Sequence, residues 1–329
     1  MRLLILLVCL TLSAVSYADD KNLDREKLIE LISKEHALNA EQKKKLSEVM
    51  SSSRYIGQGN PDVTVHPISR EACQENRKKI TDTKAGFVGV CGRPHMAPLY
   101  DVDKVKAENA KVCIDQFEFP GIPCEYPVVW VRANEAAEIC HAMGKRLCDA
   151  HEWEGACQGT MTGPDYDFAS IAGMETKAAV KKMRSAHNRS VRAGKKWSYG
   201  PAFQKGICAQ NSFKNDKCNG GNWKECGSNT YPAGSFPNCT SPLQVYDING
   251  NAAEHMNLPL TEDQRAKAGG TYGVTEMKGS WFIWDKFQAH EDWCRWRAPF
   301  WHGTRVLSDH SHHNYHLGFR CCSDVAAKK

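Results

Sequence analysis

The cysteine content constrains the fold of this chain more than any other feature of its sequence. The 329 residues include 15 cysteines, and one of them, Cys9, lies in an apolar run at the N-terminus. Fourteen cysteines remain beyond that run, an even number that suits seven disulfides and an oxidising compartment. Zinc binding is the alternative use for so many thiols, but the cysteines do not form paired C-x2-C knuckles. We therefore expect a crosslinked fold.

The apolar run at the N-terminus is typical of a cleavable export signal. It carries one early charge, Arg2, then apolar side chains as far as Val15, and it ends in small residues at Ser16-Tyr17-Ala18. A membrane anchor needs about 20 apolar residues, and this run is shorter. We expect cleavage near Ala18, a secreted or periplasmic protein, and no transmembrane segment in the mature chain.

The charge pattern argues against one class of partner. The formal net charge is only +5, and no basic patch with interleaved aromatic residues is visible. Such patches are the electrostatic footprint of nucleic-acid binding. The sequence therefore predicts no nucleic-acid partner.

The pattern of apolar residues divides the chain into an extension, a linker and one main domain. Apolar residues at helical spacing between Leu23 and Met50 predict two short helices, with Asn39 as the cap of the second. This hairpin either packs on the main domain or binds a partner. Beyond a polar linker, Cys73 and Cys91 bracket a lysine-rich stretch. The expected boundaries are a signal at 1–18, a helical extension at 19–52, a linker and crosslinked lead-in at 53–111, the main domain at 112–323 and a tail at 324–329.

The first part of the main domain predicts two strands and two helices. Alternation at 112–120 and the run 128–131 favour strands. A helix capped by Asn134 and ended by Gly144 should follow. Asp149, with a glutamate three residues later, forms a capping box and predicts a second helix.

The stretch from Gly159 to Leu243 has a different composition. It is rich in Gly, Asn, Ser and Lys and contains four cysteines. We expect long ordered loops there, held by disulfides.

An ordered set of short motifs in the main domain resembles the formylglycine-generating, or sulfatase-modifying-factor, family. The resemblance covers about Cys113 to Cys322, and its specificity lies in the order of the motifs rather than in any one of them. It implies an α+β fold, an atypical C-type-lectin-like domain that is loop-rich and disulfide-rich. The motifs are Val129-Trp130, Glu135-Ala136 with Cys140, Gly144-Lys-Arg-Leu147, Glu152-Trp-Glu154 with Ala156-Cys157, Gly234-Ser-Phe-Pro237, Tyr246-Asp-Ile-Asn-Gly-Asn-Ala-Ala-Glu254, Gly269-Gly-Thr-Tyr272 and Gly318-Phe-Arg-Cys321.

The resemblance also implies two long-range disulfides. Family members with this pattern would join Cys140 to Cys321 and Cys157 to Cys294. For the other ten cysteines the sequence offers only proximity, which makes Cys113–Cys124 and Cys218–Cys226 candidates for local pairing.

The family's oxidase chemistry does not carry over to this sequence. It uses a copper ion held by two thiolates, five and ten residues before the cysteine that corresponds to Cys294, because soft Cu(I) needs sulfur donors. Those positions hold Ala289 and Trp284. Formylglycine generation by the known route is therefore not expected, and whether this chain is an enzyme stays open.

The motif around residue 250 resembles the family's calcium loop. A side-chain oxygen, two carbonyls and a glutamate bind the ion at alternating steps, and hard oxygen donors suit Ca²⁺. The corresponding ligands are Asp247, the carbonyls of Gly250 and Ala252, and Glu254. The alternative is a tight Asn-Gly turn without an ion.

Histidines and cationic or aromatic residues gather near the C-terminus. Related iron enzymes with this scaffold hold Fe(II) with histidines, so the histidines are a candidate Fe²⁺ or Cu⁺ site, with a polar loop as the plainer interpretation. The arginines and tryptophans could line a cleft for an anionic or sugar ligand, or belong to the core. The candidate histidines are His290, His302, His310, His312, His313 and His316, and the candidate cleft residues are Arg295, Trp296, Arg297, Trp301 and Arg305.

Two functions are consistent with these patterns. The first is an exported, non-catalytic or divergent family member that binds a protein, envelope or saccharide ligand. The second is a metal-dependent oxidoreductase, with non-haem iron or copper, that acts on a protein or a small thiol.

Overall fold

The first described part of the chain is helical. The computed structural model describes residues 21–78, 86–266, 271–298 and 304–325. The two predicted N-terminal helices are confirmed, and Asn39 caps the second through a capping box with Gln42. The helices of this part are α1 (Arg25–Glu35), α2 (Ala40–Ser52), α3 (Arg70–Arg77) and α4 (Gly86–Cys91).

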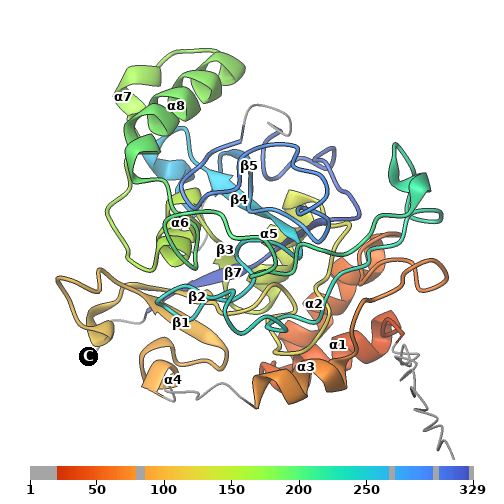
Figure 1. Ribbon diagram of the computed structural model, residues 1–329. Coiled ribbons are helices and arrows are strands. Elements are labelled where there is room, and N and C mark those ends of the chain that lie inside the picture. The colour runs from red at the N-terminus through yellow and green to blue at the C-terminus, as the bar shows by residue number, and fades with distance from the viewer. Residues whose placement is uncertain (1–20, 79–85, 267–270, 299–303, 326–329) are drawn as a thin grey trace, which may run out of the picture.

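Strands from both ends of the main domain form a four-stranded antiparallel sheet. Its order is β1-β2-β7-β3, so the C-terminal strand β7 lies between two strands that precede it by well over a hundred residues. The segment 53–111 contributes the edge strand β1 to this sheet (Figure 1). The bounds are β1 (Met96–Leu99), β2 (Val112–Asp115), β3 (Arg146–Leu147) and β7 (Cys321–Asp324).

A second sheet of three strands lies in the interior. β4 pairs antiparallel with β5 and parallel with β6. Every residue of these strands is buried, which is why their sequences show no apolar–polar alternation. The bounds are β4 (Ala253–Leu258), β5 (Val274–Lys278) and β6 (Leu317–Phe319).

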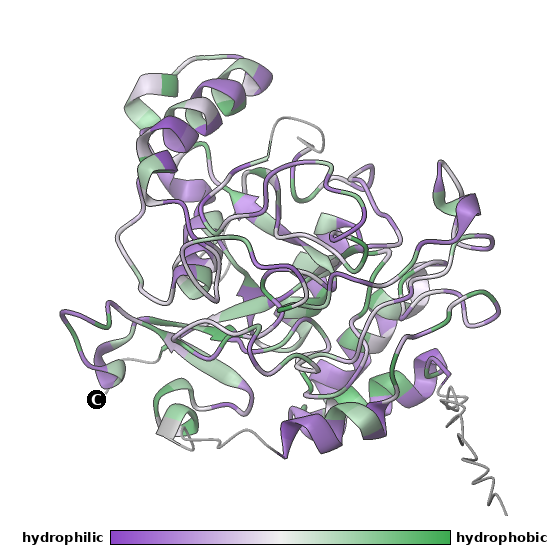
Figure 2. Ribbon diagram, in the orientation of Figure 1, coloured by the Kyte–Doolittle hydropathy of each residue, from purple (hydrophilic) through white to green (hydrophobic). Residues whose placement is uncertain are grey.

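α-Helices and short 3-10 helices make up the remaining regular structure around the sheets. The helix start predicted at Asp149 is confirmed, since its backbone N donates to Glu152 at 2.8 Å and α6 begins at the next residue. Figure 2 shows hydrophobic residues concentrated in the strands and inner helices and hydrophilic ones on the outer helices. The remaining elements are α5 (Ala133–Ala142), α6 (Ala150–Gln158), α7 (Phe168–Ile171), α8 (Thr176–Val191), η1 (Ala107–Asn109), η2 (Arg192–Gly194), η3 (Asp216–Cys218) and η4 (Glu262–Gln264).

Three expectations about local structure were wrong in detail. The cap of α5 is Arg132, not Asn134, and its backbone N donates to the carboxylate of Glu135 at 2.8 Å. Residues 128–131 form no strand, since Trp130 has a φ of 60° and only Val129 makes a bridge, to Gly57.

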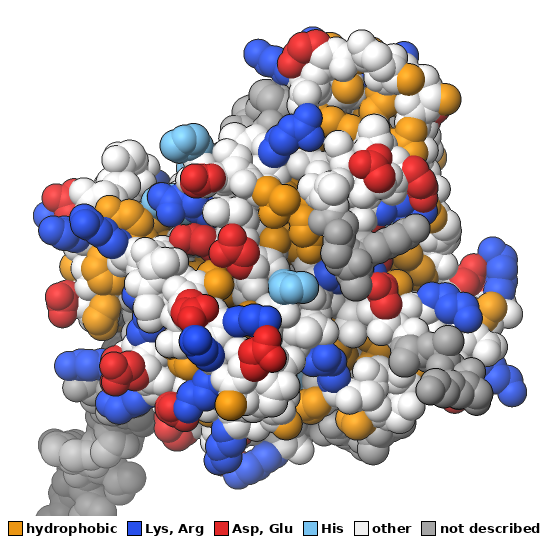
Figure 3. Space-filling model, turned by 180° about the vertical axis from the view of Figure 1, so that it is seen from behind, with side chains coloured by type: hydrophobic (Ala, Val, Ile, Leu, Met, Phe, Trp, Pro, Cys, Tyr) orange, Lys and Arg blue, Asp and Glu red, His pale blue; other side chains and the backbone are white. Residues whose placement is uncertain are grey.

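The third concerns the stretch after Gly159, which is not only loops. It contains α7 and the 16-residue α8, which project from the body of the molecule (Figure 1). α8 buries a stripe formed by Ala179, Val180, Met183 and His187, so helical periodicity was present among its many polar residues. From behind, hydrophobic side chains gather on and below this projection, while acidic and basic ones are interspersed elsewhere (Figure 3).

The N-terminal hairpin shares a hydrophobic core with the main domain. Leu28 and Ile32 of α1 and Leu46 of α2 are almost fully buried, in the same cluster as Ile139 and Cys140 of α5. His36, directly after α1, is also buried, and its Nε2 lies 2.7 Å from the carbonyl oxygen of Pro120. The hairpin is therefore packed against the domain.

The described residues include no helix that has both the length and the apolar character needed to cross a bilayer.

The docking of the hairpin should depend on pH through His36. Burial and the nearby Lys145 lower the pKa of His36 to about 4. Because this value lies below the ordinary 6.5, neutral His36 contributes its full stability above pH 6.5 and loses it as the pH falls toward 4. We expect the wild type to lose up to about 3 kcal/mol of unfolding free energy over this range, relative to His36→Gln.

The measurement is urea unfolding at several pH values with the disulfides intact. His310→Gln, at an exposed position, is the matched control and should follow the wild type. Parallel pH profiles for wild type and His36→Gln would contradict the prediction.

Candidate functional site

Seven disulfides connect the loops of the domain. They use every cysteine in the described residues, so no thiol is left there. Both long-range pairs implied by the resemblance are present, as is the local pair Cys218–Cys226. The suggested pair Cys113–Cys124 was wrong, because each of its members bonds to an earlier cysteine. The disulfides are Cys73–Cys124, Cys91–Cys113, Cys140–Cys321, Cys148–Cys322, Cys157–Cys294, Cys208–Cys239 and Cys218–Cys226.

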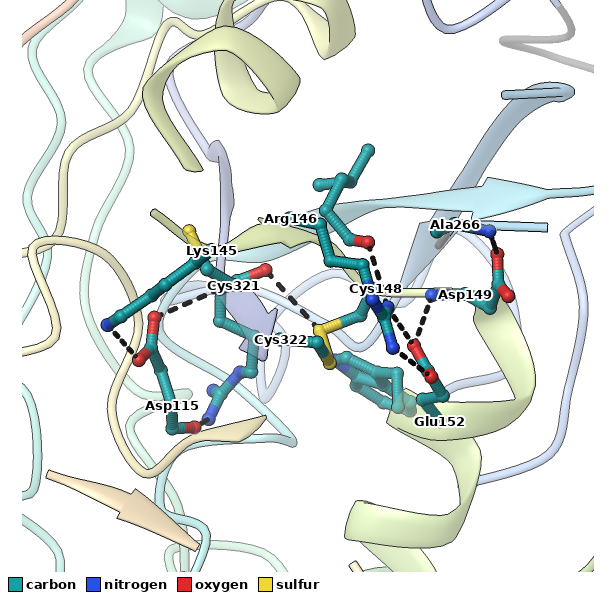
Figure 4. Close-up of a disulfide and its surroundings, with 12 residues drawn as sticks. Asp115, Lys145, Arg146, Cys148, Asp149, Glu152, Ala266, Cys321 and Cys322 are labelled. Atoms are coloured by element: carbon teal, nitrogen blue, oxygen red, sulfur yellow. Dashed lines mark hydrogen bonds and ion pairs between the residues drawn. A yellow bond between two sulfur atoms is a disulfide. The ribbon is translucent and has the colours of Figure 1, made fainter. Parts of the chain in front are cut away.

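Two neighbouring cysteines of β7 bond to partners in different elements. Successive side chains of a strand point to opposite faces, so Cys321 reaches Cys140 in α5. Cys322 reaches Cys148 after β3, as Figure 4 shows. Asp115 fixes this junction, since it accepts hydrogen bonds from the backbone N of Cys321 at 3.0 Å and from Lys145 Nζ at 2.6 Å. The C-terminal strand is thereby tied into the sheet by covalent and ionic bonds.

The two positions where the family holds copper are not alike in this structure. Trp284 is 1% exposed, and its ring lies 4.9 Å from that of Trp281. Ala289 is exposed. One position is therefore filled by a buried indole and the other faces solvent, and neither carries a sulfur donor for copper.

Aromatic rings surround Trp284 and form what we call the indole–imidazole cluster. The rings of Trp281 and His316 stack at 4.4 Å, and those of His290 and Trp296 at 4.7 Å. His290 also lies 4.7 Å from Trp284. Burial lowers the pKa of His290 to about 4, so this ring is neutral at neutral pH. The cluster comprises Trp281, Trp284, His290, Trp296 and His316.

The other C-terminal histidines are dispersed. His310 is exposed, His312 lies beside Asn314, and His313 stacks on Tyr55 at 5.5 Å. Among the described residues, no group of three potential ligand atoms within 4.8 Å includes any of these histidines or His316. His302 and Trp301 lie outside the described residues.

Two of the arginines that could line a cleft, Arg295 and Arg297, take part in an ion network instead, whereas Arg305 is exposed. Arg297 is fully buried and donates to Glu154 at 2.9 Å and to Asp165 at 3.0 Å. Arg295 donates to Asp165 at 2.7 Å. The prediction that Arg297 lines a ligand groove was therefore wrong, since this side chain is fully buried and its charge is already matched by the carboxylates of Glu154 and Asp165.

Sequence reasoning missed the other members of this network. His187 of α8 places Nδ1 2.7 Å from Asp165, and Lys278 of β5 lies 3.1 Å from Glu154. Although burial by itself would raise it, Arg297 and Lys278 lower the pKa of Glu154 to about 2. Glu154, Asp165 and His187 approach closely enough to suggest a metal site, but the surrounding cations already neutralise the carboxylates. The network fits a structural ion cluster better than a metal centre.

The calcium loop has features for and against an ion. Asp247 is 1% exposed, and its Oδ1 has no hydrogen-bond partner within the described structure. Burial raises the pKa of Asp247 to about 6, and it raises that of the neighbouring Glu118 well above its usual range. A cation would relieve this excess of buried carboxylate.

The surroundings of Glu254 argue against a bound cation. Its carboxylate accepts from Arg320 Nη2 at 2.6 Å and from Trp153 Nε1 at 2.8 Å. A guanidinium therefore already supplies positive charge at this end of the loop. The loop thus fits a cation at Asp247 and fits one less well at Glu254.

The structure also contains a polar cavity that the sequence did not indicate. It has a volume of about 600 Å³ and lies between residues 196–207 and residues 237–242. These two segments are far apart in sequence, and the disulfide Cys208–Cys239 brings them together. The two aromatic residues of Trp197-Ser198-Tyr199 were the one local feature of the sequence that could have indicated this cavity. They lie within a stretch that was expected to form loops.

Comparison with known proteins identifies the family. Among curated proteins no sequence relative matches. A solved structure, described as the crystal structure of CarF, aligns with 82% of this chain and 86% of its own at 13% identity, with a TM-score of 0.26. The sulfatase-modifying factor enzyme 1-like domain matches residues 63–325. Together with the loop-rich, disulfide-rich α+β fold, this match shows that the chain belongs to the sulfatase-modifying-factor, or formylglycine-generating-enzyme-like, family.

Proposed function

We propose that this protein is an exported, non-catalytic member of its family that binds a protein or envelope ligand. The observation that carries the proposal is Trp284, a buried indole at a position where the family's oxidases hold copper with a thiolate. Such a side chain offers copper no soft donor, and its packing with Trp281 and His290 fills the space around it. The scaffold remains, but the redox centre does not.

Two further features support binding rather than oxidation. The seven disulfides are typical of proteins that work in an oxidising compartment, which agrees with the export signal expected at residues 1–18. The ion network around Glu154 is internally matched, since Lys278 and Arg297 already pair with this carboxylate. A rigid crosslinked scaffold suits recognition, since little order has to be gained on binding.

The copper chemistry provides the test. Titration of the denatured, unreduced mature protein with a thiol reagent should detect no free thiol, and elemental analysis should find copper and iron well below one per chain. Loading with Cu(I) under reducing conditions, followed by dialysis, should leave no stoichiometric metal. Two reactive thiols that include Cys294, or one tightly held copper or iron, would overturn the proposal and favour the oxidoreductase.

We also propose that Ca²⁺ binds at the loop around Asp247, with carbonyl oxygens of Gly250 and Ala252 and with Glu254 as the other candidate ligands. The partnerless Oδ1 of Asp247 and the excess of buried carboxylate support this. Ionised Asp247 is needed, and its pKa is raised to about 6 by burial. Binding should therefore be stronger at pH 7.5 than at pH 5.

Thermal unfolding tests the calcium proposal. At pH 7.5, free Ca²⁺ at about 100 times its Kd should stabilise the protein by about 2.7 kcal/mol relative to EDTA, and the effect should shrink at pH 5. Asp247→Asn should abolish the shift, whereas Asp263→Asn, on the exposed turn after β4, should retain it. Equal melting curves with Ca²⁺ and EDTA at pH 7.5 would mean that Arg320 alone provides the balancing charge.

A further inference from the structure

The cavity between residues 196–207 and 237–242, which we call the loop pocket, is built as a rigid feature. Cys208–Cys239 joins its two walls. The disulfide Cys157–Cys294 also holds the wall at 196–207, because the backbone N of Cys294 donates to the carbonyl of Lys196 at 2.9 Å. A volume of about 600 Å³ lies within the range of small-ligand sites.

A glycine at the end of α6 closes one wall. Gly159 has a φ of 78°, and a Cβ at this position would lie 2.3 Å from Cδ of Pro242. Only glycine lets the ring of Pro242 approach the helix end so closely. The wall at 237–242 is therefore held on both sides, by a disulfide and by this close packing.

The lining combines aromatic rings with uncharged hydrogen-bonding groups. Trp197 and Tyr199 supply the rings, while Gln204, Asn238 and Thr240 supply amide and hydroxyl groups. Among the described lining residues, the only charged one is Lys196. Such a lining lacks the arginine fork or the several cations expected for a phosphate or an acidic peptide.

The indole of Trp197 is fixed in place. Its Nε1 donates to Asp292 at 2.7 Å, and Phe203 packs against its ring at 6.0 Å with T-shaped geometry. Tyr199 is also held, since its hydroxyl accepts from the backbone N of Gln204. Preorganised aromatic side chains of this kind cost little entropy on binding.

A buried hydroxyl in the pocket wall points to a polar ligand. Ser198 is 4% exposed, and its Oγ has no hydrogen-bond partner within the described part of the chain. A buried hydroxyl left without a partner destabilises the folded state, because its contact with water is lost and not replaced. A ligand hydroxyl entering the pocket would offer both a donor and an acceptor to Ser198.

From these features we infer that the loop pocket binds a neutral saccharide. Sugars present apolar C–H faces that pack on aromatic rings and many hydroxyls that pair with amides and hydroxyls. The inference rests on the proposed function, because it names the class of ligand for a non-catalytic scaffold. It assigns recognition to Trp197, Ser198, Tyr199, Gln204, Asn238 and Thr240.

The test uses the mature, disulfide-intact protein with two neutral probes, chitotriose and maltotriose. We expect saturation-transfer NMR signals from at least one of them and a titration curve by calorimetry. Tyr199→Ala should weaken binding about tenfold or more through loss of an aromatic contact surface. Asn238→Ala, at an exposed position of the rim, should also weaken it and should not disturb folding.

Phe287→Ala is the matched control, since Phe287 is a 56% exposed aromatic residue outside the pocket, and it should bind like the wild type. Retention of all seven disulfides by mass mapping verifies the fold of each variant. No signal from either probe at millimolar concentration, or equal loss in Phe287→Ala and Tyr199→Ala, would overturn the inference. These outcomes are independent of the copper test, so failure of one does not imply failure of the other.

Discussion

One buried ion pair joins the two sheets on which the fold is built. Arg320 is the single residue between β6 and β7, and it is fully buried. Its guanidinium binds the carboxylate of Glu254 in β4 and also donates to the carbonyls of Asp115 and Tyr246. The chain therefore passes from one sheet to the other at Arg320, whose positive charge is paired with Glu254 and hydrogen-bonded to two carbonyls. Loss of one partner would leave an uncompensated buried charge, which typically costs about 3–5 kcal/mol.

The disulfides strengthen the same junction, and their contributions are not additive. In the chain-entropy model, Cys140–Cys321 alone closes a loop worth about 5 kcal/mol. When Cys140–Cys321 is already formed, Cys148–Cys322 closes only a cycle of about nine residues. The same model gives this second disulfide about 2–3 kcal/mol of stabilisation. The second bond serves chiefly to fix the orientation of β3 against β7. Rigidity at this point holds the long loops that carry the pocket.

Two groups of carboxylates differ in whether their negative charge is balanced by neighbouring cations. The network of Glu154, Asp165 and Arg297 pairs each carboxylate with cations. Around Asp247 and Glu118, by contrast, buried carboxylates exceed the buried guanidinium of Arg320, and burial raises their pKa values. The first region is structural, whereas the second is the place where a cation would be gained.

The sequence by itself determined the family, the α+β class, the expectation of disulfides and the identities of the two residues, Trp284 and Ala289, at the positions where the resemblance places copper ligands. These depend on residue identity at ordered positions, such as Cys140, Cys321 and Trp284, and need no knowledge of distances. It also predicted α6 and the Asn39 cap, because capping boxes are local. Only the tertiary structure decided the four disulfides that neither the resemblance nor proximity had indicated, the burial of Arg297 and the existence of the loop pocket. Each of these depends on contacts between segments distant in sequence, which no local pattern encodes.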